Sequence, residues 1–291
     1  MSPAGGGQAP AAAPNGSRPG GAPGEGGRRE RFARLVRAQR IWAVAAIHGE
    51  AERLERLHDR LGRAWERGDR LVYLGNFLGR NAGAARTVDE ILGFRRAVLA
   101  LPRSFAGDVA FLRGSQEEMW QKLLQLQFAV SPRDVLQWML DQGVAATLQA
   151  YGGDPQQGFA ACREGPRALT RWTSALRAQL NAMPGHSQFL GALRRAALTD
   201  DGRLLFVHAG LDATRPLDTQ GDAFWWDGRR LLELARPYAG FRRVIRGFDH
   251  LHRGVVEAEF ATSIDAGCGF GGELVAVCFA PDGAVLQTVS S

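Results

Sequence analysis

The sequence predicts an α/β protein with a mixed sheet and a helical insert, and three features support this. In the first part of the chain, short apolar runs that end in polar residues alternate with amphipathic helical patterns, which is typical of parallel strands joined by helices. A mostly helical stretch, about residues 128–200, follows. The chain then returns to short strand-like segments, the last two of which are separated by the turn Asp282-Gly283.

The first part of the chain contains three strand–helix repeats. The expected strands are residues 41–47, 71–75 and 109–112. The helix after the first strand runs from about residue 50 to residue 63 and places Leu54, Leu57 and Leu61 on one face. Because each pair of strands is separated by a helix, we expect parallel strands with right-handed crossover connections.

The helical insert is interrupted at Pro132, at Gly152–Pro155 and at Pro184-Gly185. Strands are expected again at residues 204–208 and 242–246. We expect the chain to end in an antiparallel meander made of the segments 260–265, 273–279 and 284–289.

The N-terminal region differs in composition. Residues 1 to about 27 are mainly Gly, Ala and Pro, so they cannot bury enough apolar surface to offset the entropy of ordering, and we predict that they are disordered. The arginine-rich stretch 28–40 is either a short basic helix carrying Phe32, Leu35 and Val36 or a solvated lead-in to the first strand. We therefore divide the chain into a tail, residues 1–40, and a domain, residues 41–291.

Composition excludes several classes of protein. The net charge is +6, but Lys122 is the only lysine and the arginines are spread along the chain, so a nucleic-acid-binding surface is not indicated. No apolar run approaches the ~20 residues that span a bilayer. Without a signal-peptide pattern, we expect a cytoplasmic protein. The three cysteines indicate neither a disulfide framework nor a zinc site.

Polar residues follow four of the predicted strands, where open α/β sheets place their sites. The segments are Ile41–Gly49, Arg70–Arg80, Asp108–Glu117 and Leu204–Gly210. Their order and spacing resemble the calcineurin-like metallophosphoesterases, and more closely the bacterial branch of protein serine/threonine phosphatases. The resemblance covers about residues 41–285 and implies a four-layer sandwich with mixed central sheets and a helical insert.

The resemblance implies two divalent metal ions, such as Mn, Fe or Zn, that activate water for attack on a phosphate ester. The family's first motif, Gly-Asp-x-His-Gly, reads Ala45–Gly49 here, so Ala46 replaces a ligand aspartate and His48 is kept. In the second motif, Asn76 replaces the aspartate that bridges the metals, and Gly79 replaces another aspartate.

The remaining motifs are also altered. Ser115 replaces an amide ligand, and Gln116 stands at the position of the general-acid histidine. The fourth motif is intact and contains His208, whereas Phe248 replaces the last histidine. Of the expected metal ligands, only the histidines of the first and fourth motifs are unchanged.

These substitutions argue against the two-metal reaction. Two divalent ions at about 3.5–4 Å repel each other strongly, and Ala46 and Asn76 supply no negative charge between them. Gln116 cannot transfer a proton near neutral pH, because an amide does not titrate there. We therefore expect no resident metal cofactor.

Alternatives remain for the surviving polar residues. The candidate metal ligands, either retained from the family site or forming a new one, are His48, Asn76, His208 and Asp249. His250 and His252 lie next to Asp249 in the sequence. The other interpretation of His48 is a hydrogen bond within its loop, and that of the segment 249–252 is a polar surface turn.

Arg80 and Arg113 match family arginines and are the candidate phosphate-binding residues. The alternative for this pair is an ordinary salt bridge, for example to Glu117.

We therefore predict a degenerate metallophosphoesterase, a pseudophosphatase that binds a phosphorylated small molecule, a phosphoprotein or another protein partner. The first alternative is an active metal-dependent phosphoesterase that hydrolyses a phosphoprotein or a nucleoside polyphosphate at a rebuilt site. A second alternative is a tether to nucleic acid or an anionic surface through the N-terminal arginines.

Overall fold

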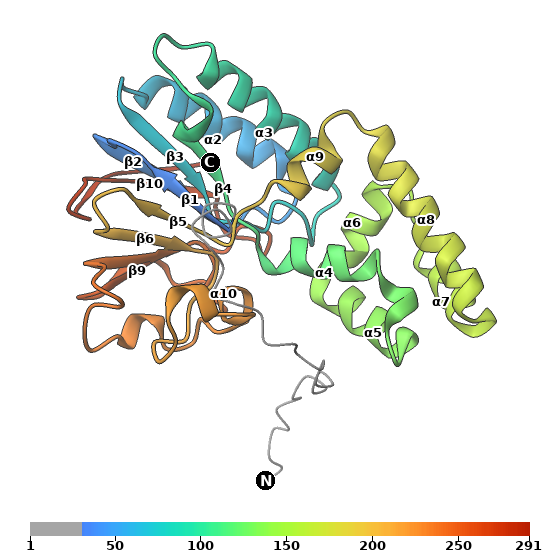
Figure 1. Cartoon of the computed structure of the whole chain (residues 1–291). Coiled ribbons are helices and arrows are strands. Elements are labelled where there is room, and N and C mark those ends of the chain that lie inside the picture. Colours follow the sequence, from blue (N-terminus) through green and yellow to red (C-terminus); the bar gives the residue numbers. More distant parts are fainter. Residues whose placement is uncertain (1–30) are drawn as a thin grey trace.

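A computed structural model describes residues 31–291 as two β-sheets that pack against each other, with helices on their outer faces (Figure 1). One sheet has the strand order β11-β10-β2-β3-β4, and the other has the order β1-β5-β6-β7-β9-β8. Residues from the facing sides of both sheets share one apolar core, in which Phe206 meets Phe279 at a ring separation of 6.3 Å. This confirms the predicted α/β fold.

The five-stranded sheet contains the three predicted parallel strands. These are β2 (Arg40–Val44), β3 (Asp69–Tyr73) and β4 (Val109–Phe111). Helix α2 (Ala51–Ala64) and helix α3 (Ala84–Leu99) lie against the outer face of this sheet (Figure 1). Strand β2 is almost entirely buried because both faces of its sheet are covered, which explains its continuous apolar sequence.

The six-stranded sheet is formed mostly by the second half of the chain. Its strands are β1 (Phe32–Leu35), β5 (Ala196–Thr199), β6 (Leu204–Val207), β7 (Arg243–Arg246), β8 (Gly254–Glu257) and β9 (Ala261–Asp265). A second apolar cluster covers its outer face and includes Phe224 and Trp225 of the short helix α10 (Ala223–Trp226).

The predicted insert is helical and projects to one side of the sheets (Figure 1). Helix α4 (Ser115–Leu123) lies before the predicted insert. The helices of the insert are α5 (Pro132–Met139), α6 (Ala145–Ala150), α7 (Pro155–Glu164), α8 (Pro166–Ala182) and α9 (His186–Gly191). The start of α7 shows how the sequence sets these boundaries, because the Asp154 carboxylate accepts a hydrogen bond from the Gln156 N–H and Pro155 occupies the first turn. Among residues 31–291, no helix has the length and apolar character needed to cross a membrane.

The expected C-terminal meander is wrong in one respect. Strand β10 (Val275–Phe279) pairs antiparallel with β11 (Val285–Ser290), as predicted. Strand β9, however, belongs to the other sheet, where it pairs with β7 and with the unpredicted strand β8. The loop after β9 crosses from one sheet to the other, and apolar patterning alone does not distinguish this crossing from a hairpin.

The structure shows neither alternative for residues 32–35, a basic helix or a solvated lead-in, since these residues form a strand in which Phe32 and Leu35 are buried. Residues Phe32–Leu35 form β1, which pairs in parallel with β5. The sheet thus includes residues that lie before the predicted domain boundary at residue 41. The segment predicted to be disordered, residues 1 to about 27, lies outside the described residues.

Strand β1 provides a stability test. The Phe32 side chain is 5% exposed and meets Phe224 at a ring separation of 6.4 Å. Phe32→Ala should therefore lower the free energy of unfolding by about 3–5 kcal/mol, measured by urea denaturation of the full chain. Val36→Ala is the matched control, since Val36 is 48% exposed; it should change stability by less than about 0.5 kcal/mol. Equal effects of the two substitutions would mean that Phe32 is not part of the core.

Candidate functional site

The loops after β2, β3, β4, β6 and β7 meet at one edge of the two sheets, where the sequence places the altered motifs. His48 and Asn76 have positive φ angles of 57° and 51°, which non-glycine residues adopt rarely. A Cβ atom at Gly114 would lie 2.3 Å from both the backbone N and the Oδ1 of Asn76. The loop after β3 and the loop after β4 therefore pack so closely that only glycine fits at this position.

Glu117 joins these two loops. Its Oε2 accepts hydrogen bonds from the Asn76 N–H (2.9 Å) and the Gly114 N–H (2.8 Å), and its Oε1 accepts one from the Leu78 N–H (2.9 Å). The side chain is buried. Burial raises the pKa of the Glu117 carboxyl, while the three N–H donors act in the opposite direction. This carboxylate satisfies backbone donors that would otherwise be buried without partners.

Asn76 stands where the sequence resemblance implies a bridging aspartate, and its polar atoms already have partners. Its Oδ1 accepts hydrogen bonds from the Gln116 N–H (2.9 Å) and the Ser115 hydroxyl (3.2 Å). Its Nδ2 lies 3.3 Å from His48 Nε2. Because an amide nitrogen donates, His48 Nε2 accepts and the ring carries its proton on Nδ1. The side chain is therefore committed to hydrogen bonds that hold the site together.

Both surviving histidines are buried and neutral. Burial lowers the pKa of His48 well below its ordinary value, with further lowering by His208 and nearby cations. Burial also lowers the pKa of His208 to about 4. The His208 Nδ1–H donates to the Leu74 carbonyl oxygen at 2.7 Å, so Nε2 carries the lone pair. Within the described part of the chain, neither His48 Nδ1 nor His208 Nε2 has a hydrogen-bond partner.

Phe248 contacts both histidines. Its ring is stacked on His208, with centroids 5.4 Å apart and planes at 4°, and lies 5.7 Å from the His48 ring. It also forms a small apolar cluster with Ala46 and Ala209. The two positions at which the sequence resemblance implies an aspartate and a histidine thus carry a methyl group and a phenyl ring in one apolar cluster.

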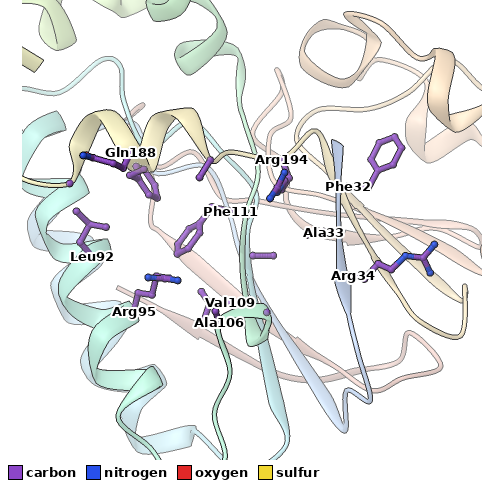
Figure 2. A pocket seen from close by; sticks show the side chains of 15 residues that line it. Phe32, Ala33, Arg34, Leu92, Arg95, Ala106, Val109, Phe111, Gln188 and Arg194 are labelled. Carbon is purple, nitrogen blue, oxygen red and sulfur yellow. The ribbon is translucent and has the colours of Figure 1, made fainter. Parts of the chain in front are cut away.

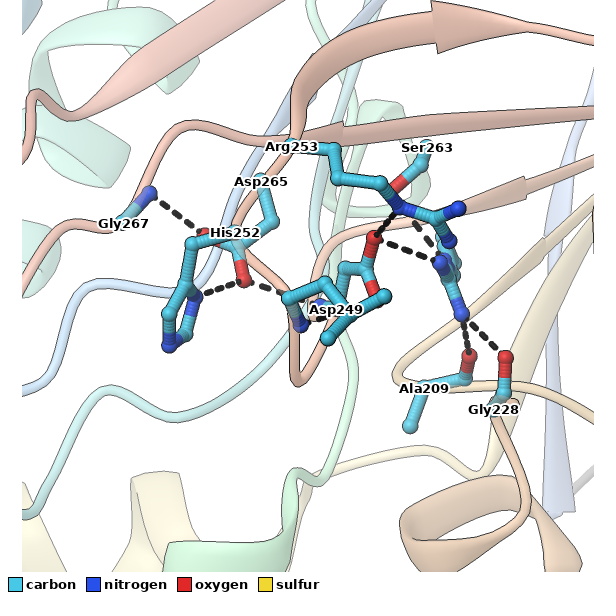
Figure 3. A network of polar contacts seen from close by, with 10 residues as sticks. Ala209, Gly228, Asp249, His252, Arg253, Ser263, Asp265 and Gly267 are labelled. Carbon is cyan, nitrogen blue, oxygen red and sulfur yellow. Dashed lines mark hydrogen bonds and ion pairs between the residues drawn. The ribbon is translucent and has the colours of Figure 1, made fainter.

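Asp249 is held by arginines (Figure 3). Its Oδ2 lies 2.9 Å from Arg246 Nη2 and 2.7 Å from Arg253 Nε. The neighbouring His252 Nδ1 lies 2.8 Å from the Asp265 carboxylate. Between residues 31 and 291, no three or more His, Cys, Asp and Glu side chains are arranged so as to hold a metal ion. In this structure Asp249 is paired with two guanidinium groups and is not grouped with His48 and His208.

The candidate arginines occupy different places. Arg80 lines a cavity of about 110 Å³ together with His48, Gln116, Phe248, His250 and Phe270. Its guanidinium carbon lies 4.2 Å from the centre of the Phe270 ring. Arg113 lines a separate cavity of about 260 Å³ and forms an ion pair with Glu118 at 3.3 Å. The expected arginine pair is thus not assembled, and the partner of Arg113 is Glu118 instead of Glu117.

Gln116 contributes an acceptor to the cavity of Arg80. Its Nε2 donates to the Gln142 carbonyl oxygen at 2.8 Å, which leaves Oε1 without a partner among the described residues. Sequence reasoning missed Gln142, Trp226 and Phe270, which also line this cavity. Their loops and helices are distant in sequence, and only the tertiary fold brings them to the strand tips.

Glu117→Gln tests the loop contact. The glutamine has one acceptor oxygen, and its NH₂ group would face at least one buried N–H, so we expect a loss of about 1–3 kcal/mol in the free energy of unfolding. Glu118→Gln is the control, since Glu118 forms two partly exposed ion pairs; it should cost about 1 kcal/mol or less. Chemical denaturation at neutral pH measures both. A similar small loss in both variants would contradict the assigned role of Glu117.

Comparisons with known proteins address the fold. No protein-family model matches the sequence, and the comparison with curated proteins finds no match. Among solved structures, a protein serine/threonine phosphatase from Saccharomyces cerevisiae is similar with a TM-score of 0.50 and 14% identity, covering 89% of this chain and 80% of that chain. A provisionally assigned diadenosine tetraphosphatase has a TM-score of 0.49 and 20% identity, covering 90% of this chain and 98% of that chain.

A metallophosphoesterase from Sphaerobacter thermophilus gives a TM-score of 0.43 and 14% identity, covering 87% of this chain and 86% of that chain. Identities this low do not transfer a substrate or an activity, because one fold hosts many functions. With its two mixed sheets and flanking helices, the chain has the metallophosphoesterase fold.

Proposed function

We propose that this chain is a binding protein built on the metallophosphoesterase fold, and that the cavity beside Arg80 takes a phosphate-bearing ligand without hydrolysing it. The position of Phe248 carries the proposal. Its ring contacts both surviving histidines and packs on Ala46, so apolar atoms stand where the family has two metal-binding side chains.

The charges around Phe248 support the same proposal. The two histidines are neutral, and Asn76 has no negative charge. Asp249 is paired with Arg246 and Arg253. Glu117 already accepts hydrogen bonds from three backbone N–H groups. A pair of divalent cations would thus meet no carboxylate without partners here, and their mutual repulsion would be poorly offset.

Arg80 supplies the positive charge for a ligand. It has no ion pair within residues 31–291, and Phe270 lies beneath its guanidinium. His48 Nδ1–H is an unpartnered donor, and Gln116 Oε1 is an unpartnered acceptor. A phosphate oxygen would accept from Arg80 and His48, while a protonated phosphate oxygen or a hydroxyl would donate to Gln116. The cavity of about 110 Å³ has room for a phosphate group.

Titration calorimetry with phenyl phosphate tests this proposal. The unaltered chain should bind phenyl phosphate equally well with and without added Mn²⁺. Arg80→Gln should weaken binding about tenfold, as expected for the loss of a charge-assisted hydrogen bond. Arg113→Gln is the matched control and should leave the affinity unchanged, because Arg113 lines a different cavity.

Two results would contradict the proposal. One is an affinity that Arg80→Gln does not alter. The other is Mn²⁺-dependent release of phenol that disappears in His208→Ala, which would show an active phosphoesterase.

A further inference from the structure

A second cavity lies away from the strand tips (Figure 2). Its volume is about 680 Å³, which is in the range of small-molecule sites, and it shares no lining residue with the cavity of Arg80. Its walls come from β4, β1, helix α3 and the region of helix α9, so four parts of the chain far apart in sequence meet here.

The ends of the two sheets create this cavity. β4 is the last strand of one sheet, and β1 is the last strand of the other. The two sheet edges meet at Arg194, whose N–H donates to the Phe111 carbonyl oxygen (2.9 Å) and whose carbonyl oxygen accepts from the Arg113 N–H (2.7 Å). Beyond this junction the cavity lies between β4 and β1, and small residues such as Ala33, Ala110 and Gly185 leave it open.

The charged residues that line this cavity are all positive. Arg34, Arg95 and Arg194 line the cavity, and none of its described lining residues is acidic. Arg95 is half-buried, and no ion pair or side-chain hydrogen bond of Arg95 is found within residues 31–291. Figure 2 shows Arg95 and Arg194 near Phe111, one on helix α3 and the other next to the sheet junction. A partly desolvated guanidinium without a carboxylate favours an anionic ligand.

The other walls are apolar and rigid. Leu92, Val109, Phe111 and Phe189 provide most of the large apolar side chains. The Phe111 ring is stacked on Tyr73 with centroids 5.2 Å apart, and Phe189 meets Phe111 edge-on at 5.2 Å. These contacts fix the Phe111 ring, so it can serve as a preformed surface for an apolar group.

We propose that this cavity is a binding site for an amphipathic organic anion, in which a carboxylate, sulfonate or phosphate lies beside Arg95 and an apolar body packs on Phe111. Both an aliphatic acid and a ring-bearing phosphate have the anionic group and the apolar body that this lining would bind. Such a site is independent of the cavity beside Arg80 and of the function proposed for it.

Fluorescence titration with anilinonaphthalene sulfonate tests this site, because this probe combines an aromatic body with an anion and becomes fluorescent at apolar surfaces. Saturable binding at one site is expected. Arg95→Gln should weaken binding about tenfold through loss of a charge-assisted hydrogen bond. Gln188→Glu keeps the size of a lining side chain but adds a negative charge, and it should weaken binding several-fold.

Arg103→Gln is the matched control, since Arg103 lines another cavity of similar size, about 620 Å³. It should leave the probe affinity unchanged, and thermal denaturation should show that all three variants are folded. Displacement of the probe by octanoate would identify an aliphatic acid as the ligand class. Displacement by adenosine monophosphate would instead identify a ring-bearing phosphate. The proposal is overturned if neither compound displaces the probe, if both cavity variants bind it normally, or if Arg103→Gln weakens binding equally.

Discussion

The candidate site depends on one buried carboxylate. Glu117 accepts hydrogen bonds from the backbone of the loop after β3 and from the backbone of the loop after β4. Those loops carry Asn76 and Gly114, which approach so closely that a side chain at position 114 would collide with Asn76. With the loops fixed, Asn76 is oriented toward His48, and the hydrogen bonds of both side chains follow. The Glu117 carboxylate and its backbone donors therefore hold the geometry of the strand tips.

The substitutions at the strand tips fit one another. Ala46 and Phe248 stand at two positions where the resemblance implies metal ligands, and they pack together. Phe248 stacks on His208, and burial keeps the pKa of His208 at about 4. A neutral imidazole against an apolar ring is a compatible pair, because neither group leaves a buried charge without a partner. The side chains at the strand tips thus fit one another.

The sequence predicted the three parallel strands β2, β3 and β4, because a buried strand reads as a continuous apolar run and its tip is polar. It could not predict that β9 and β10 lie in different sheets, since both are buried strands joined by a glycine-rich loop. It also missed β1, whose partner β5 follows more than 150 residues later. Pairing over that distance leaves no local pattern in residues 32–35.

Some properties of the candidate site residues were predictable from the sequence and others were not. The tips themselves, with His48, Asn76, Gln116 and His208, were identified from motif order, and the structure places them in one buried region. The directions of the arginine side chains were not predictable, so the expected pairing of Arg80 with Arg113 is not found. The ion pairs of Asp249 could have been predicted from the sequence, because Arg246 lies three residues before it and Arg253 four residues after it.

A crystal structure of the full chain grown in excess Mn²⁺, with anomalous diffraction data, tests the central claim most directly. We expect the Phe248 ring to remain stacked on His208 and no anomalous peak to lie beside His208 Nε2. A manganese peak bonded to His208 Nε2, with the Phe248 ring displaced, would contradict the central claim and would show that the site still binds metal.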